Sequence, residues 1–158
     1  MISRLETIQQ IVDDAISKSA DVKRNYVHSY GVSNCSAVLA IKRGLNPELA
    51  SVAGMLHDIS YVVFGNYDNH TELGAHMAEK IMKNTGRFTF HEIGIVTQAI
   101  LRHDDRHIVH DPYDEVLKDA DILHPYLIDV TKKPNPNTVA KLLALFLELD
   151  LIWRVGER

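Results

Sequence analysis

The sequence predicts an all-α fold, a compact bundle of about six to seven helices. Apolar residues recur at spacings of three and four along most of the chain, which is the period of one helix face. Helix start and stop signals, such as Asn46-Pro47, Gly44 and Asp111-Pro112, separate these segments. No segment shows the sustained apolar/polar alternation that indicates a strand.

Three helices are predicted in the first part of the chain. Apolar residues between Ile2 and Ile16 follow the helical spacing and give an amphipathic helix. A second helix runs from about Val22 to Arg43, because Gly44 suits the left-handed conformation of a C-cap. Asn46 then supplies an N-cap for a third helix over about 47–59, with a proline in its first position.

Four further helices follow after a predicted loop over Tyr61–Asn69, which contains the turn signal Gly-Asn. Thr89 and Glu92 have the spacing of a capping box, so the fifth helix begins there and ends near His103. Residues 104–111 are predicted as a second loop. The remaining predicted helices cover about 70–83, 112–123 and 138–153, with a proline-containing linker over Lys132–Asn137.

Composition describes an ordinary globular chain. Its 158 residues suggest one domain over 1–158, with a core at about 22–128 that carries the motifs, followed by the last helix. The 46% apolar fraction excludes general disorder, and a net charge of −4 excludes a broadly basic nucleic-acid surface. No apolar run has the length of a membrane span and no signal sequence is recognised. One cysteine fits a reducing compartment, so we expect a cytoplasmic protein without a membrane partner.

Nine histidines stand out in so short a chain. Residues of the metal-ligand type fall on different predicted helices, and helices can each send one ligand to a common point. They are His28, His57-Asp58, His70, His103 and Asp121. Leu56 and Ile59 flank the His-Asp pair, where an unpaired carboxylate would be costly. Imidazole with carboxylate suits Mn, Fe, Co, Ni or Zn, and Mg is an alternative.

The order of these residues resembles the HD-domain superfamily of metal-dependent phosphohydrolases. Five segments carry the resemblance: RNYVHSYGV, ASVAGMLHDIS, HTELGAHMAEKIM, AILRHD and VLKDADIL. The resemblance covers about Arg24 to Leu127 and implies the all-α HD helical bundle. It implies that His28, His57, Asp58 and Asp121 bind one metal ion.

The same resemblance implies a second ion or phosphate at His70 and His103, with lining of the pocket as the alternative role of these two histidines. The implied activity is hydrolysis of a small phosphate ester or nucleotide by metal-activated water. Arg24 lies four residues before His28 and is expected to contact substrate phosphate. Lys118, three before Asp121, is expected to meet a phosphate or to pair with a carboxylate. Asp58 is the catalytic candidate for handling protons, with Asp119 as the alternative.

Other interpretations remain open at this point. The same ligand set serves di-iron oxygenases of the HD type, and a metal-retaining domain that binds nucleotide without turnover is a third hypothesis. The segment 103–111 has two interpretations, a separate metal site or a solvated mixed-charge loop, and we favour the loop. His91 and His124 are expected at surface or packing positions, and Cys35 in the core. The apolar segment Leu142–Trp153 could pack across a homodimer.

Overall fold

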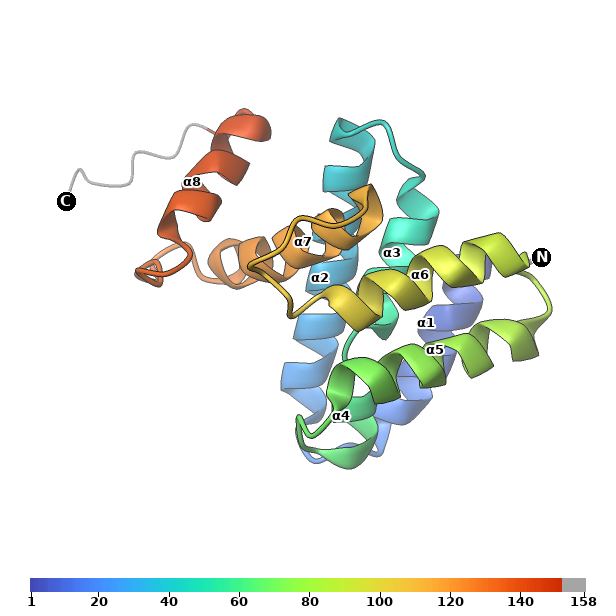
Figure 1. Cartoon of the computed structure of the whole chain (residues 1–158). Coiled ribbons are helices and arrows are strands. Elements are labelled where there is room, and N and C mark those ends of the chain that lie inside the picture. The colour runs from blue at the N-terminus through green and yellow to red at the C-terminus, as the bar shows by residue number, and fades with distance from the viewer. Residues whose placement is uncertain (152–158) are drawn as a thin grey trace.

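The structure is a computed structural model and describes residues 1–151. In that range it consists of helices joined by loops, with no strand (Figure 1). The helices are α1 (Arg4–Ser17), α2 (Val22–Lys42), α3 (Pro47–Leu56), α4 (Ile59–Phe64), α5 (His70–Thr85), α6 (Phe90–Arg102), α7 (Pro112–Ile128) and α8 (Val139–Glu148). None of the described helices is both long and apolar enough to cross a membrane.

The long helix α2 runs through the middle of the bundle, with α3 and α7 packed against it (Figure 1). Helices α5 and α6 form an adjacent pair, and α6 also contacts α3 and α7. The core between these helices is almost fully buried and apolar, with Leu39, Leu56, Ile100 and Leu123 among its largest side chains. This arrangement brings the first half of α2, the end of α3 and the middle of α7 to one interior region.

A glycine allows α2 and α3 to approach closely. A Cβ atom at Gly54 would lie 2.6 Å from the backbone Cα of Ser33, so no larger residue fits without a shift of one helix. The Ser33 hydroxyl donates a buried hydrogen bond of 2.9 Å to the Ser51 carbonyl across the same contact. The close approach fixes the position of α2 relative to the end of α3.

The all-α prediction is confirmed, and the seven predicted helices correspond to α1–α3 and α5–α8. The loop predicted over 61–69 is wrong in its first part, because residues up to Phe64 form α4 and Gly65 caps it in the left-handed conformation. Buried Ile59 and Val62 hold α4 on the core, although β-branched residues have low helix propensity. The last helix ends at Glu148, and residues 152 and 153 of its predicted range lie outside the described residues.

Helix α8 lies at one end of the described part of the molecule (Figure 1). Arg43, which caps α2, donates to Glu148 of α8 at 2.8 Å and to the buried Asp119 of α7 at 2.6 Å. The ammonium of Lys141 in α8 lies 3.0 Å from the other Asp119 oxygen. Two leucines of α8, Leu142 and Leu145, are buried. Helix α8 is therefore attached by apolar packing and by one cluster of ion pairs.

Candidate metal centre

His57 and Asp58 occupy a junction between two helices. Helix α3 ends at Leu56, Asp58 has φ −104° and ψ 20°, and α4 begins at the next residue. We expected the pair on the last turn of one helix, so this is a correction. The break in the helix lets two consecutive side chains face the same interior region. Both residues are buried, His57 at 1% and Asp58 at 6% exposure.

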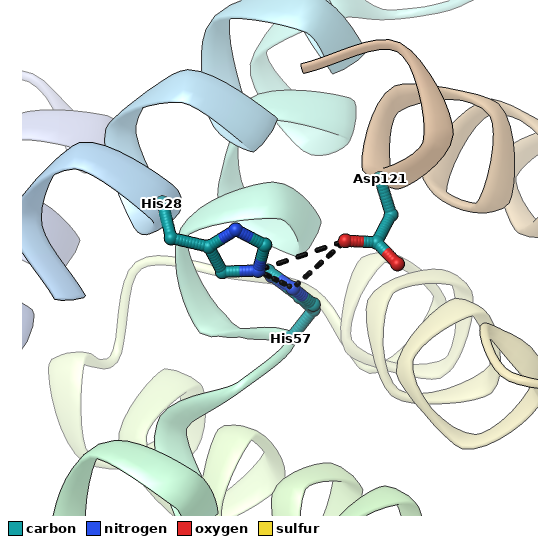
Figure 2. A group of neighbouring side chains, drawn as sticks. All are labelled: His28, His57 and Asp121. Atoms are coloured by element: carbon teal, nitrogen blue, oxygen red, sulfur yellow. Dashed lines mark hydrogen bonds and ion pairs between the residues drawn. The ribbon is translucent and has the colours of Figure 1, made fainter. Parts of the chain in front are cut away.

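Four of the predicted ligands come together at this junction. Figure 2 shows His28 from α2, His57 after α3 and Asp121 from α7 with their polar atoms pointing toward one another. The two Nε2 atoms of His28 and His57 are 3.0 Å apart. Oδ1 of Asp121 lies 3.6 Å from the first and 3.9 Å from the second. Oδ2 of Asp58 lies 3.3 and 3.5 Å from the same two atoms.

A second group adjoins the first through Asp58. Its other oxygen, Oδ1, is 3.8 Å from Nε2 of His103, which caps the end of α6. Nε2 of His103 is also 3.7 Å from Asp104, and Nε2 of His70 at the start of α5 is 3.1 Å from the same carboxylate. The structure therefore brings all six of the predicted histidines and aspartates into one cluster. Asp104 is an additional member that the sequence did not single out.

Backbone carbonyls fix the orientation of three of these histidines. Nδ1 of His57 lies 2.8 Å from the Gly54 carbonyl, Nδ1 of His103 lies 2.6 Å from that of Ile100, and Nδ1 of His70 lies 3.1 Å from that of Tyr67. A carbonyl only accepts, so each Nδ1 carries a proton, and the neutral form of each ring offers its lone pair at Nε2. Histidines that bind a metal ion through one ring nitrogen usually donate the N–H of the other to a carbonyl or carboxylate in this way.

The donor set fits a divalent ion in distance and in chemistry. A metal about 2.0–2.2 Å from two neighbouring ligands places those ligands roughly 3.0–3.6 Å apart, close to the separations around His28 and His57. Burial alone would raise the pKa of the Asp58 carboxyl, but His57 and a hydrogen bond from His28 outweigh it and hold that pKa below its usual range. Asp58 is thus an anion among imidazole nitrogens, and a cation at the same place would stabilise it.

Two residues that the sequence placed near this chemistry, Lys118 and Asp119, have their polar contacts with other residues. The Lys118 ammonium donates to the Ile108 carbonyl at 2.9 Å and to Glu115 at 2.7 Å, and it contacts Nδ1 of His110 at 2.7 Å. All its donors are used, so Lys118 pairs with a carboxylate, which is one of its two expected roles, and anchors the loop 104–111. Asp119 binds Arg43 in the α8 ion-pair cluster and does not face the histidines.

Arg24 does lie beside the centre. One of its terminal nitrogens donates to the Tyr67 hydroxyl at 2.8 Å, and its guanidinium lies 4.6 Å from the centre of the Tyr61 ring. Burial lowers the pKa of Arg24, but Tyr67 and, through space, Tyr61 and Asp58 raise it above its usual value. The ring of Tyr67 in turn meets the His70 ring edge to face, with centres 5.1 Å apart, so Arg24 is linked to the metal-ligand cluster through Tyr67.

Two further side chains lie around Asp121: Arg106, which the sequence interpretation missed, and His124, which it expected at a surface or packing position. Arg106, from the loop 104–111, donates to Oδ2 of Asp121 at 2.6 Å, so that Oδ1 alone faces the histidines. His124, one turn after Asp121, is buried with its ring 5.4 Å from that of His28. A Cβ at Gly31 would lie 1.9 Å from the His124 ring, so α2 needs a glycine there. The one signal in the sequence that could have pointed to Arg106 is that it is the only arginine or lysine of this mixed-charge loop.

The contact from Arg106 predicts a role in metal binding. Replacing Arg106 with glutamine is expected to weaken the affinity for a divalent ion about 10- to 100-fold, the usual cost of losing an outer hydrogen-bond partner of a ligand. Calorimetric titration of the metal-free protein with Mn²⁺ measures this change. Lys80→Gln, on the exposed face of α5, is the matched control that also removes one positive charge. Equal affinities in all three proteins would contradict the role of Arg106.

Comparisons with known proteins agree with this geometry. The HD domain family matches residues 25–126. Ribonuclease Y of Clostridium tetani is 35% identical over 77 residues, which are 48% of this chain and 13% of that protein. Ribonuclease Y of Lactobacillus gasseri is 33% identical over 79 residues, again 13% of its length. This chain therefore spans only a small part of these curated relatives, and no solved structure matches it significantly. Because the family match covers most of the chain and includes the whole histidine–aspartate cluster, this chain belongs to the HD domain family.

Proposed function

We propose that this chain is a metal-dependent phosphohydrolase that acts on a small phosphate ester or nucleotide through metal-activated water. The observation that carries the proposal is the convergence of His28, His57, Asp58 and Asp121 from α2, α7 and the junction between α3 and α4. The separations of their polar atoms suit a shared ion, and three rings of the cluster have preset lone pairs. Membership of the HD domain family supports the same activity.

The cluster offers ligand atoms for one or two ions. The first would be held by His28, His57, Asp121 and Oδ2 of Asp58. The second would be held by His70, His103, Asp104 and Oδ1 of Asp58, so that Asp58 bridges the two positions. Mn, Fe, Co, Ni or Zn suits such nitrogen and oxygen donors, with Mg as an alternative. A bound ion supplies an activated water near neutral pH and polarises the phosphoryl oxygens.

The side chains around the ions have distinct proposed roles. With one ion bound, Oδ1 of Asp58 would be free to accept a hydrogen bond from the attacking water and to take its proton. The water oxygen would bond to phosphorus as the ester P–O bond breaks, and the leaving oxygen would take up a proton from Asp58 or from solvent. Arg24 contacts the phosphoryl oxygens with a planar guanidinium. Arg106 holds Asp121 with one oxygen toward the ion and adds a positive charge near the developing negative charge.

Two other activities use the same cluster and are separated by substrate and oxygen dependence. The curated relatives are named ribonucleases, which places RNA phosphodiesters among the substrates to be tested. The two groups of histidines and aspartates that meet at Asp58 also suit two iron ions, as in a di-iron oxygenase. An iron-loaded protein that consumes oxygen and releases no phosphate would favour the oxygenase.

Purified protein is expected to contain a divalent transition metal and to release phosphate from small esters. Elemental analysis gives the metal, and a screen in Mn²⁺ or Co²⁺ then covers sugar phosphates, nucleotides, dinucleotides and short RNA. Chelation is expected to stop turnover, and addition of the metal to restore it, because the activated water depends on the ion. A protein without bound metal that hydrolyses none of these substrates under either ion would contradict the proposal.

A further inference from the structure

Two tyrosines and an arginine form a cluster at the edge of the metal centre. We define this aromatic–arginine cluster as Arg24 of α2, Tyr61 of α4 and Tyr67 of the loop before α5. The two tyrosine rings are stacked, with centres 4.3 Å apart and an interplanar angle of 23°. The Arg24 guanidinium lies over Tyr61 and donates to the Tyr67 hydroxyl. These contacts fix the plane of the guanidinium without using all of its N–H groups.

The charge of Arg24 has no acidic partner in the described part of the chain. Among residues 1–151, no Asp or Glu oxygen lies within 4.0 Å of its guanidinium, whereas Arg102 and Arg106 each pair with a carboxylate. Its other donated hydrogen bond goes to the neutral side-chain amide of Asn25 at 3.1 Å. A fixed and uncompensated guanidinium is suited to bind an anion through charge-assisted hydrogen bonds.

The aromatic–arginine cluster borders the group around His70. The Tyr67 carbonyl accepts the hydrogen bond that orients His70, and the two rings meet edge to face with centres 5.1 Å apart. The Tyr67 hydroxyl oxygen already accepts from Arg24, so its own hydrogen is available to a ligand. Tyr67 is 49% exposed, so solvent and ligand can reach it.

We propose that Tyr67 is a substrate-binding residue, whose hydroxyl forms with Arg24 an anion subsite for the phosphoryl group of a phosphate monoester. This proposal rests on the proposed function and adds the substrate class. A monoester leaves three phosphoryl oxygens free, one more than a diester. Such a group can therefore contact the ions and still present an oxygen to Arg24 and Tyr67. Tyr61 is the positioning residue that holds the guanidinium in plane by cation–π contact.

Binding of inorganic phosphate to the metal-loaded protein tests the subsite without requiring turnover. Tyr67→Phe removes only the hydroxyl and is expected to raise the dissociation constant about 10-fold, the typical loss for a hydrogen bond to a charged group. Arg24→Lys is expected to cause a similar loss, because lysine keeps the charge but lacks the planar fork. Tyr26→Phe is the control, since that hydroxyl faces the Asp13 carbonyl at 3.4 Å on the α1 side.

Metal content distinguishes substrate binding from a purely structural role. The three variants are expected to hold as much metal as the wild type. Loss of metal in Tyr67→Phe would show that Tyr67 acts through His70 and would overturn the proposal. Wild-type phosphate affinity in Tyr67→Phe, or no phosphate binding by the wild type, would also overturn it.

The substrate class is tested with p-nitrophenyl phosphate and bis(p-nitrophenyl) phosphate, which share a leaving group. In Tyr67→Phe we expect kcat/KM for the monoester to fall about 10-fold further than for the diester. Equal losses on both would overturn the assignment to monoesters. If phosphate binding depends on Tyr67 but no ester is hydrolysed, the subsite stands and the proposed hydrolase function fails. If wild type and variant hydrolyse esters equally well, the proposed subsite is wrong and the proposed hydrolase function stands.

Discussion

Asp58→Ala is expected to remove bound metal and to reduce phosphate release by more than about 100-fold. Loss of a residue that only supports a metal ligand costs up to about 100-fold, and loss of a ligand itself should cost more. Asp58 contacts both groups of the cluster, so its loss removes a ligand from each proposed ion position. The fold is expected to persist, because the residue lies at a helix junction and its side chain caps no helix. Elemental analysis, circular dichroism and a phosphate-release assay measure these three effects.

His57→Ala serves as the second variant of this test, because its ring belongs to the same proposed ion position. Asp14→Ala is the matched control, since Asp14 is exposed on α1 and pairs only with Lys18 in the neighbouring turn. Wild-type metal content in either Asp58→Ala or His57→Ala would show that the ligand assignment is wrong. An unfolded Asp58→Ala protein would leave His57→Ala to decide the question.

Gly54→Ala is expected to destabilise the protein by about 1–3 kcal/mol, the usual cost of inserting a carbon into a packed interior. The added Cβ would meet the backbone of Ser33, which cannot rotate away as a side chain can. Separation of α2 from α3 would also move His28 away from His57, so we expect weaker metal binding. Urea unfolding and a Mn²⁺ titration measure the two effects.

Gly94 provides a matched control on α6. A Cβ there would meet nothing within 4 Å, so Gly94→Ala should be neutral or should stabilise the helix by up to about 1 kcal/mol. A Gly54→Ala protein as stable as the wild type would mean that the two helices can separate without loss. It would then follow that their close approach does not fix the geometry of the metal centre.

Local signals in the sequence predicted most helix ends, because caps act over a few residues. Thr89 and Glu92 form the expected capping box at α6, and Asn46 accepts from the first amides of α3. The break after Leu56 was not predictable in this way. The residues on both sides are apolar and buried, so the periodicity continues across the junction and hides it.

The histidines and aspartates were found because their order along the chain resembles a family, and the structure brings them together. The residues that support them were harder to predict. Arg106 reaches Asp121 from a loop whose course depends on Lys118, His110 and Glu115, none of which marks a turn by its type. Lys118 has the spacing expected for the centre, yet its amine turns toward the loop. Helical spacing gives the face of a residue but not the conformation of a long side chain.

The link from Asp121 through Arg106 to the loop 104–111 has a thermodynamic consequence. An ion that favours one orientation of Asp121 also favours the loop conformation that delivers Arg106, and the coupling free energy is the same in both directions. Ordering of the loop and occupancy of the site are therefore parts of a single equilibrium. A substitution far along the loop can change how tightly a cation is held without touching any of its ligands.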